Sequence, residues 1–221
     1  MASILFRVLN FVWLKEFIEL AYWKITRITN KKLSNAHYKE FYTRYFSLSE
    51  DFYDDKRILD IGCGPRGSLE WANTAKERIG IDPLAHQYLK MGAKDHRMTY
   101  VSGYLEKLPF ADHYFDVICS FNSIDHVDDL MTCCNEIKRT LKEDGLFLLI
   151  VDVHSVPTVT EPQTIDWNFI SHYFPEFEVV DEKRLERLVR YKIYGNVRAG
   201  KAIDGNPEVG VLTAKLKKRR A

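Results

Sequence analysis

The sequence predicts an α/β protein with a mostly parallel sheet of about seven strands, helices on its faces and an antiparallel strand at one edge. Short apolar runs alternate with helical patterns between residues 57 and 151, as in strand–helix–strand units. Beyond residue 154, two apolar runs follow without a clear helix between them, which favours antiparallel pairing. A glycine-rich turn directly after the first of these strands is the third observation.

The alternating region predicts five strands, at Arg57–Ile61, Arg78–Ile81, Met98–Ser102, Phe115–Ser120 and Leu146–Val151. Helices are expected at Ser68–Lys76, Pro83–Met91, Asp129–Leu141 and near Ile165–Tyr173. The last two strands are expected at Phe177–Val180 and Gly210–Leu216, on either side of a glycine-punctuated stretch. Ligands of parallel sheets bind beyond the carboxyl ends of the strands, so the residues that follow each strand are the site candidates.

Residues 1–50 are expected to form a helical extension to a main domain of residues 51–221. The stretch Ile4–Ile25 is apolar on most sides, but charged residues such as Lys15 and Glu19 make it unconvincing as a membrane span. It fits a helix packed on the domain or on a second copy, or a helix on a membrane surface. In a second expected helix, Asn35–Phe46, aromatic residues recur at a spacing typical of core packing, with a substrate-facing lid as the alternative.

Composition indicates a globular protein, with 46% hydrophobic and 29% charged residues. The 32 basic and 31 acidic residues nearly balance, so the net charge gives no reason to expect a nucleic-acid partner. Cys63, Cys119, Cys133 and Cys134 have no metal-binding spacing, and we find no cleavable secretion signal before them. We therefore expect a cytoplasmic protein without a metal site, in contact with a membrane only if the first helix lies on one.

The turn Gly62–Gly67 reads G-C-G-P-R-G. Glycine adopts backbone angles and allows a close ligand approach that other residues prevent, and a helix start after it would offer N–H donors to an anion. The turn also satisfies G-x-G-x-x-G, with Asp82 about 20 residues further on, so this pattern alone leaves a nicotinamide dinucleotide open. Asp60, two residues before the first glycine, favours a ligand with an ammonium group instead.

Four motifs together resemble those of the class I S-adenosylmethionine-dependent methyltransferases, which have a Rossmann-like fold. They read I-L-D-I-G-C-G-P, G-I-D-P, E-K-L-P-F-A-D-H-Y-F-D-V-I and L-K-E-D-G-L-F, and they cover roughly residues 56–153. The segments G-P-R-G-S-L-E-W, S-F-N-S-I-D-H-V and P-T-V-T-E-P-Q-T are similar to those of small bacterial methyltransferases associated with polysaccharide biosynthesis.

The resemblance implies S-adenosylmethionine as the cofactor and S-adenosylhomocysteine as its product. The implied cofactor-binding residues are Asp60, Gly62, Cys63, Gly64, Asp82, Pro83, Leu105, Glu106 and Asn122. Asp82 would accept both ribose hydroxyls, since a carboxylate has two acceptor oxygens. Gly103-Tyr104-Leu105-Glu106 stands where relatives often have G-D-A-E, so the adenine would rely on the backbone of Leu105, with Glu106 a weaker candidate.

The acceptor is expected beyond the fourth and fifth strands. Asp125 and His126 follow the fourth strand, and Asp152 and His154 follow the fifth. A hydroxyl acceptor loses a proton, and histidine is suited to take one near neutral pH. The expected catalytic residues are His126, Asp125 and His154, although His126 could equally be a loop histidine that bonds the backbone. Glu161 either reaches back over the pocket or stays exposed in its loop.

The sequence thus predicts an S-adenosylmethionine-dependent methyltransferase that methylates a hydroxyl of a sugar, a glycan or another small molecule. One alternative is a nicotinamide-dependent oxidoreductase, which Asp60 and the block Leu108–Phe110 disfavour. Another is a non-catalytic methyltransferase-like module that binds a partner through the N-terminal helices. The expected partner is the small-molecule or glycan acceptor, and the first helix would add a membrane surface or a second copy of the chain.

Overall fold

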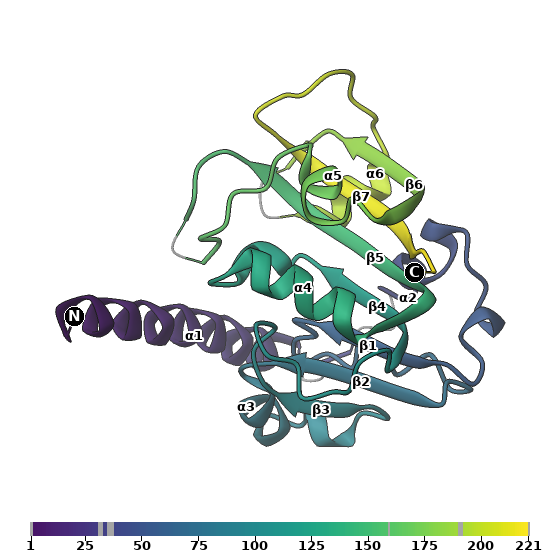
Figure 1. Ribbon diagram of the computed structural model, residues 1–221. Helices are drawn as coiled ribbons and strands as arrows, with labels where there is room; N and C mark the ends of the chain where they lie inside the picture. The colour runs from purple at the N-terminus through teal and green to yellow at the C-terminus, as the bar shows by residue number, and fades with distance from the viewer. Residues whose placement is uncertain (1, 31–32, 35–37, 159, 190–191, 221) are drawn as a thin grey trace.

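The computed structural model describes residues 2–30, 33–34, 38–158, 160–189 and 192–220, with only the backbone of residues 2–13 and 30. A seven-stranded sheet of order β3-β2-β1-β4-β5-β7-β6 lies at its centre (Figure 1). The strands are β1 (Arg57–Ile61), β2 (Glu77–Asp82), β3 (Thr99–Ser102), β4 (Phe115–Phe121), β5 (Leu141–His154), β6 (Phe177–Leu185) and β7 (Val209–Lys218). Only β7 pairs antiparallel with its neighbours among these strands, so the predicted fold class is confirmed.

The apolar runs of the central strands are continuous because both faces of the sheet are covered. In β1, Ile58 packs into a hydrophobic cluster on one face, whereas Leu59 and Ile61 pack into a cluster on the other. The same alternation in β4 places Val117 on the first face and Ile118 on the second. Parallel strands of this kind leave their polar residues at the strand ends.

Helices cover both faces of the sheet (Figure 1). The helices are α1 (Ala2–Asn30), α2 (Lys39–Tyr42), α3 (Ala85–Lys90), α4 (Leu130–Thr140), α5 (Phe169–Tyr173) and α6 (Ile193–Ala199). Residues of α4 and α5 belong to one hydrophobic cluster, and residues of α2 and α6 belong to the other. In α4, the side chain of Asp129 caps the first turn by accepting a hydrogen bond from Thr132 N at 3.0 Å.

The helix expected at Ser68–Lys76 is absent, and that prediction was wrong. The segment forms turns closed by hydrogen bonds between residues three apart, such as Glu70 N to Gly67 O at 3.1 Å. Gly67 has a φ of 69°, outside the helical region. Leu69, two residues later, is fully buried in the core, which fixes the path of the chain there. No helix N-terminus therefore follows the glycine turn, and an anion cannot bind to one there as the sequence led us to expect.

The second N-terminal helix is shorter than expected. α2 is followed by a 3-10 turn at Arg44–Phe46, and residues 35–37 lie outside the described part of the chain. The expected core packing is confirmed, because Phe41, Tyr42 and Phe46 are almost fully buried. α6 was not predicted, since the glycine within it at position 195 reads as loop sequence.

Candidate active site

The carboxyl ends of β1, β2, β4 and β5 bring the predicted site residues to one edge of the sheet. Parallel register places Asp60 of β1 beside Gly80 of β2 and Cys119 of β4. The chain order reverses between β1 and β4, because β2 and β3 extend from one side of β1 and β5 from the other side of β4. This is the position at which open α/β sheets bind ligands.

The glycine turn after β1 has a conformation that needs glycine. Gly62 and Gly64 have φ values of 66° and 55°, in the left-handed region. A side chain at Gly62 would also collide with the loop after β4, since its Cβ would lie 2.4 Å from Cβ of Ser123. Ser123 fixes that loop against β1 by donating a hydrogen bond to Ile61 O at 2.8 Å. The turn is therefore a backbone cradle bounded by the ends of two strands.

Asp82, at the end of β2, is 4% exposed and holds the turn in place. Its Oδ2 accepts from Gly64 N at 3.2 Å, and its Oδ1 accepts from Leu84 N at 2.9 Å. Burial, with a further contribution from the carboxylate of Glu19, raises the pKa of Asp82 to about 7. Each oxygen keeps a second lone pair, as acceptance of a ribose hydroxyl requires.

Asp60 lies deeper, with 2% exposure. The Tyr42 hydroxyl donates to its Oδ2 at 3.1 Å, which links α2 to β1. Burial raises the pKa of Asp60 to about 7. The carboxyl group therefore anchors the N-terminal region as well as standing under the glycine turn.

The remaining predicted cofactor residues differ in their burial and in their contacts with the rest of the protein. Cys63 fills space as expected, because a Cβ at Gly80 would lie 2.5 Å from its sulfur, and burial raises the pKa of its thiol. Pro83 is exposed next to Asp82. Asn122 has a left-handed φ of 57°, and its N–H donates to Ile150 O at 2.7 Å, so its backbone turns the chain after β4.

In the segment expected near the adenine, Leu105 is buried, with 5% exposure, and the Glu106 side chain is already hydrogen-bonded within the protein. Glu106 accepts from Asp128 N at 2.9 Å and from Asp129 N at 3.3 Å, so its carboxylate holds the chain before α4. The Tyr104 hydroxyl donates to Glu16 of α1 at 2.7 Å, which explains the tyrosine at this unusual position.

α1 crosses this edge of the sheet, and the sequence analysis did not assign its side chains to the site. A Cβ at Gly64 would lie 3.2 Å from the Trp23 ring, and Tyr88 donates to Glu19 at 3.2 Å. Lys15 donates to the backbone carbonyl of His126. Lys15, Glu19 and Trp23 are four residues apart, which places them on one helix face. Charged residues four positions apart within an otherwise apolar helix, Lys15 and Glu19, were the signal in the sequence that could have identified this face.

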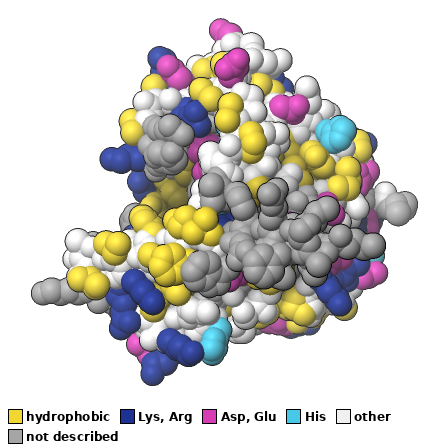
Figure 2. Space-filling view, turned by 90° about the vertical axis from the view of Figure 1, so that its left-hand side faces the viewer, with side chains coloured by type: hydrophobic (Ala, Val, Ile, Leu, Met, Phe, Trp, Pro, Cys, Tyr) yellow, Lys and Arg dark blue, Asp and Glu magenta, His cyan; other side chains and the backbone are white. Residues whose placement is uncertain are grey.

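Away from these contacts, α1 exposes apolar side chains together with Lys24 and Arg27. Among the residues with described side chains, Phe17, Tyr22, Ile25 and Ile28 are between 55% and 82% exposed. The side of the molecule from which α1 projects shows hydrophobic side chains interspersed with lysines and arginines (Figure 2). No helix in the described part of the chain has the length and hydrophobicity that a membrane span requires.

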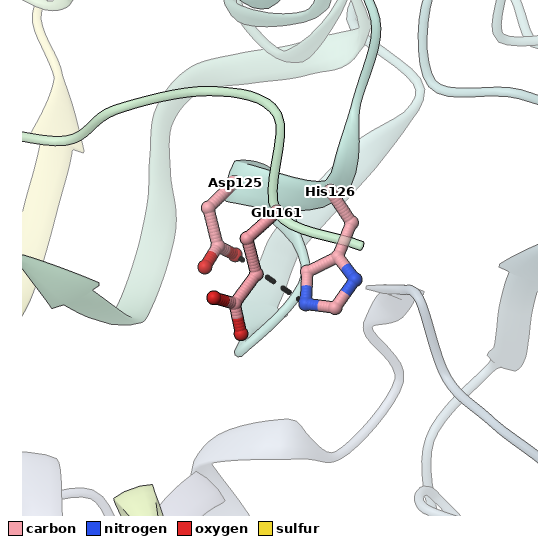
Figure 3. A group of neighbouring side chains, drawn as sticks. All are labelled: Asp125, His126 and Glu161. Carbon is pink, nitrogen blue, oxygen red and sulfur yellow. Dashed lines mark ion pairs between the residues drawn. The ribbon is translucent and has the colours of Figure 1, made fainter. Parts of the chain in front are cut away.

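The predicted catalytic residues do come together beyond β4 and β5. Asp125 is fully buried, with His126 Nε2 3.8 Å from its Oδ1 and His154 Nε2 3.9 Å from its Oδ2. Asp152 lies close enough that burial and the Asp125 carboxylate raise its pKa to about 6. The carboxylate of Glu161 reaches the same place, so the loop carboxylate is not left in solvent (Figure 3).

Comparison with known proteins decides the class of the domain. Residues 59–149 match the model of the methyltransferase domain family. Residues 59–149 therefore carry a methyltransferase domain. This domain is similar to the uncharacterized methyltransferase YcgJ of Bacillus subtilis, with 29% identity over 143 residues, which cover 61% of this chain and 48% of YcgJ. It is also similar to the sterol 24-C-methyltransferase of Candida albicans, with 26% identity over 122 residues, which cover 52% of this chain and 31% of that protein.

Solved structures agree on the fold of the methyltransferase domain. The crystal structure of the Bacillus subtilis YcgJ protein has a TM-score of 0.59 at 16% identity and covers 80% of this chain and 99% of that one. A methyltransferase from Thermotoga maritima, described as a possible histamine N-methyltransferase, has a TM-score of 0.56 at 16% identity, covering 91% and 97%. The chain spans about half or less of the length of the curated relatives named above.

S-adenosylmethionine is the cofactor of such a domain, and the residues present fit it. The glycine turn allows close approach to the backbone, and the adjacent Asp82 carboxylate can accept hydroxyls. The predicted methyltransferase class and its cofactor are thus confirmed at the level of the domain. The association with polysaccharide biosynthesis stays a prediction.

The raised pKa of Asp60 predicts a pH-dependent stability. Its pKa of about 7 exceeds the ordinary value of 3.8, so its contribution to stability is greatest below pH 3.8 and is lost as the pH rises through about 7. Asp60→Asn should remove this loss. Its free energy of unfolding relative to wild type should therefore rise by about 2 kcal/mol from pH 5 to pH 8, measured by denaturant unfolding of cofactor-free protein. Exposed Asp204→Asn is the control. If the difference in free energy of unfolding between Asp60→Asn and wild type were the same at pH 5 and pH 8, the pKa of Asp60 would not be raised by burial.

Proposed function

We propose that the protein transfers the methyl group of S-adenosylmethionine to a hydroxyl of a small polar acceptor, such as a sugar or glycan. The observation that carries this proposal is the polar cluster beyond β4 and β5, in which Asp125, Asp152 and His154 are buried and His126 is partly exposed. A sterol, the substrate named for the Candida albicans relative, would need an apolar wall at this place. Carboxylates and imidazoles suit a hydroxylated acceptor better.

The two sides of the site have different tasks. Bound S-adenosylmethionine supplies an electrophilic methyl group on a cationic sulfur. We assign its binding to the glycine turn, Asp60, Asp82, Pro83, Leu105 and Asn122, with Glu106 acting through the chain before α4. Holding the acceptor oxygen in line with the methyl carbon in a water-poor pocket is worth up to about 7–11 kcal/mol in favourable cases.

Asp125, His126 and His154 form the proton-handling part of the site. When the acceptor oxygen bonds to the methyl carbon, the carbon–sulfur bond breaks and the hydroxyl proton leaves. An unprotonated imidazole nitrogen close to that oxygen favours this loss. The buried carboxylate of Asp125 lies between the two histidines.

Residues 1–50 are proposed as an extension to a methyltransferase domain of residues 51–221. Trp23 and Glu19 cover the cofactor side, so α1 has to shift when the cofactor enters. We further propose that the exposed apolar side chains of α1 contact either a membrane surface or a second copy of the chain. This assignment suits a cytoplasmic protein with a peripheral contact.

The cofactor assignment predicts that Asp82→Ala weakens S-adenosylhomocysteine binding by about 10- to 100-fold, because two charge-assisted hydrogen bonds to hydroxyls are lost. Calorimetric titration of the full chain measures this. Asp112→Ala removes an exposed carboxylate elsewhere and should leave the affinity unchanged. Equal affinity of Asp82→Ala and wild type would contradict the assignment, and binding of NADH in preference to S-adenosylhomocysteine would favour the oxidoreductase alternative.

The position of Trp23 predicts a kinetic effect. Trp23→Ala removes the ring that lies over Gly64 and should raise the association rate constant for S-adenosylhomocysteine, measured by stopped-flow fluorescence of the remaining tryptophans. Ile28→Ala changes an 82% exposed residue of the same helix and is the matched control. If both variants associate at the wild-type rate, α1 does not cover the site.

The acceptor side predicts that His126→Ala lowers methyl transfer by about 10²- to 10⁴-fold while S-adenosylhomocysteine affinity changes little. Methyl transfer to a panel of sugars, nucleotide sugars and glycans is the assay. His172→Ala, at an exposed histidine in α5, is the control. Loss of cofactor affinity in His126→Ala, or full activity, would remove His126 from the acceptor side.

A further inference from the structure

The acceptor side contains buried polar atoms that lack the hydrogen bonds such atoms normally have. Among the described residues, neither carboxylate oxygen of Asp125 has a hydrogen-bond partner, although this residue is fully buried. Nε2 of His126, Nε2 of His154 and Oδ1 of Asp152 are also shielded from solvent and unpaired. Leaving such a group unpaired destabilises the fold, and more so when the group is charged. Several together in one place indicate a missing partner.

The orientation of His154 shows what kind of partner is missing. Its Nδ1 lies 3.0 Å from Val156 O, and a carbonyl oxygen can only accept, so Nδ1 carries the hydrogen. Its Nε2 faces Oδ2 of Asp125 at 3.9 Å, which is too long for a direct hydrogen bond, and the carboxylate favours a positive charge at this place, as the raised pKa of His154 indicates. A ring N–H donated to a backbone carbonyl is also the usual arrangement of a metal-binding histidine.

Glu161 is brought to Asp125 by a folded loop. Glu161 N donates to Thr158 Oγ1 at 3.0 Å, and Gln163 N donates to the Asp125 carbonyl at 3.2 Å. The metal-binding atoms of Asp125, His126 and Glu161 consequently lie within 4.8 Å of one another. The carboxylates of Asp125 and Glu161 lie on the same side of the His126 ring, and that of Asp125 faces its nitrogen (Figure 3). Two carboxylates this close repel each other unless one of them is protonated or a positive charge lies between them.

The neighbouring lysine does not supply that charge. Lys15 donates to the His126 carbonyl and lies 3.6 Å from Asp128. In the described part of the chain, neither Asp125 nor Glu161 forms an ion pair with a lysine or arginine. The space between them is therefore polar, anionic and lined by imidazole nitrogen.

We propose that Asp125, His126 and Glu161 bind a divalent transition-metal cation, with His154 positioning Asp125 from its other carboxylate oxygen. Mixed imidazole and carboxylate ligands suit Mn²⁺, Fe²⁺ and Zn²⁺, whereas Mg²⁺ prefers oxygen ligands and retained waters. This proposal departs from the sequence-based expectation that the chain has no metal site, which rested on the spacing of cysteines and histidines.

The cation also gives the cluster a role in the acceptor chemistry. A cation beside the acceptor would hold a hydroxyl oxygen and lower its pKa, with His126 acting as a ligand and the proton passing to His154. This role rests on the proposed methyl transfer, whereas metal binding itself does not.

The test is metal binding by the full chain without cofactor, after a chelator has removed bound metal. Mn²⁺ is titrated by electron paramagnetic resonance and Zn²⁺ by calorimetry. We expect one site, with Zn²⁺ bound more tightly than Mn²⁺ and Mg²⁺ most weakly. Asp125→Asn and His154→Gln should weaken Mn²⁺ binding by at least about 10- to 100-fold. Exposed His172→Gln and Glu208→Gln are matched controls and should bind as wild type does.

Thermal unfolding separates loss of the site from loss of the fold. Metal-free Asp125→Asn should unfold at or above the wild-type temperature, because a buried unpaired charge is removed. Mn²⁺ should raise the unfolding temperature of wild type but not of this variant. No Mn²⁺ or Zn²⁺ binding to wild type, or equal binding by wild type, Asp125→Asn and His154→Gln, would overturn the proposal. S-adenosylhomocysteine titration of the same samples tests the methyltransferase proposal independently.

Discussion

The buried carboxylate of Asp82 joins two strand ends that would otherwise be independent. By accepting the N–H groups of Gly64 and Leu84, it fixes the glycine turn after β1 to the chain after β2. The glycine turn also packs against Ser123 after β4, so the ends of β1, β2 and β4 are held in fixed positions relative to one another. Burial disfavours the ionised carboxylate, which is why the pKa of Asp82 rises to about 7. The site is thus built at a cost in stability that binding of a ligand would offset.

The reversal of strand order between β1 and β4 divides the site into two sides. The side formed by β1 and β2 offers backbone groups and a carboxylate, which suits a cofactor with hydroxyls. The side formed by β4 and β5 concentrates Asp125, His126, Asp152 and His154, which suits chemistry on a polar acceptor. α1 spans both sides, with Trp23 and Glu19 at the first and Lys15 at the second. One helix therefore contacts both halves of the site.

The strands and the glycine turn were predictable because apolar runs and the glycine spacing are local signals. The bounds of β1 agree with the prediction, and Asp60 and Asp82 lie at the expected strand ends. The segment Ser68–Lys76 was not predictable from its helical pattern, since Gly67 and the buried Leu69 impose turns through contacts that are not local. The same holds for Glu106, whose hydrogen bonds to Asp128 and Asp129 depend on the placement of α4. Trp23 and Glu161 reach the site only through the tertiary fold.

The central claim is that the cofactor binds at the glycine turn beneath α1. Amide hydrogen exchange of the full chain with and without S-adenosylhomocysteine tests it most directly. The account predicts slower exchange at residues 62–67 and 82–84 on binding, together with changed exchange in α1 at residues 14–29. Unchanged exchange in all three segments at saturating S-adenosylhomocysteine would contradict it.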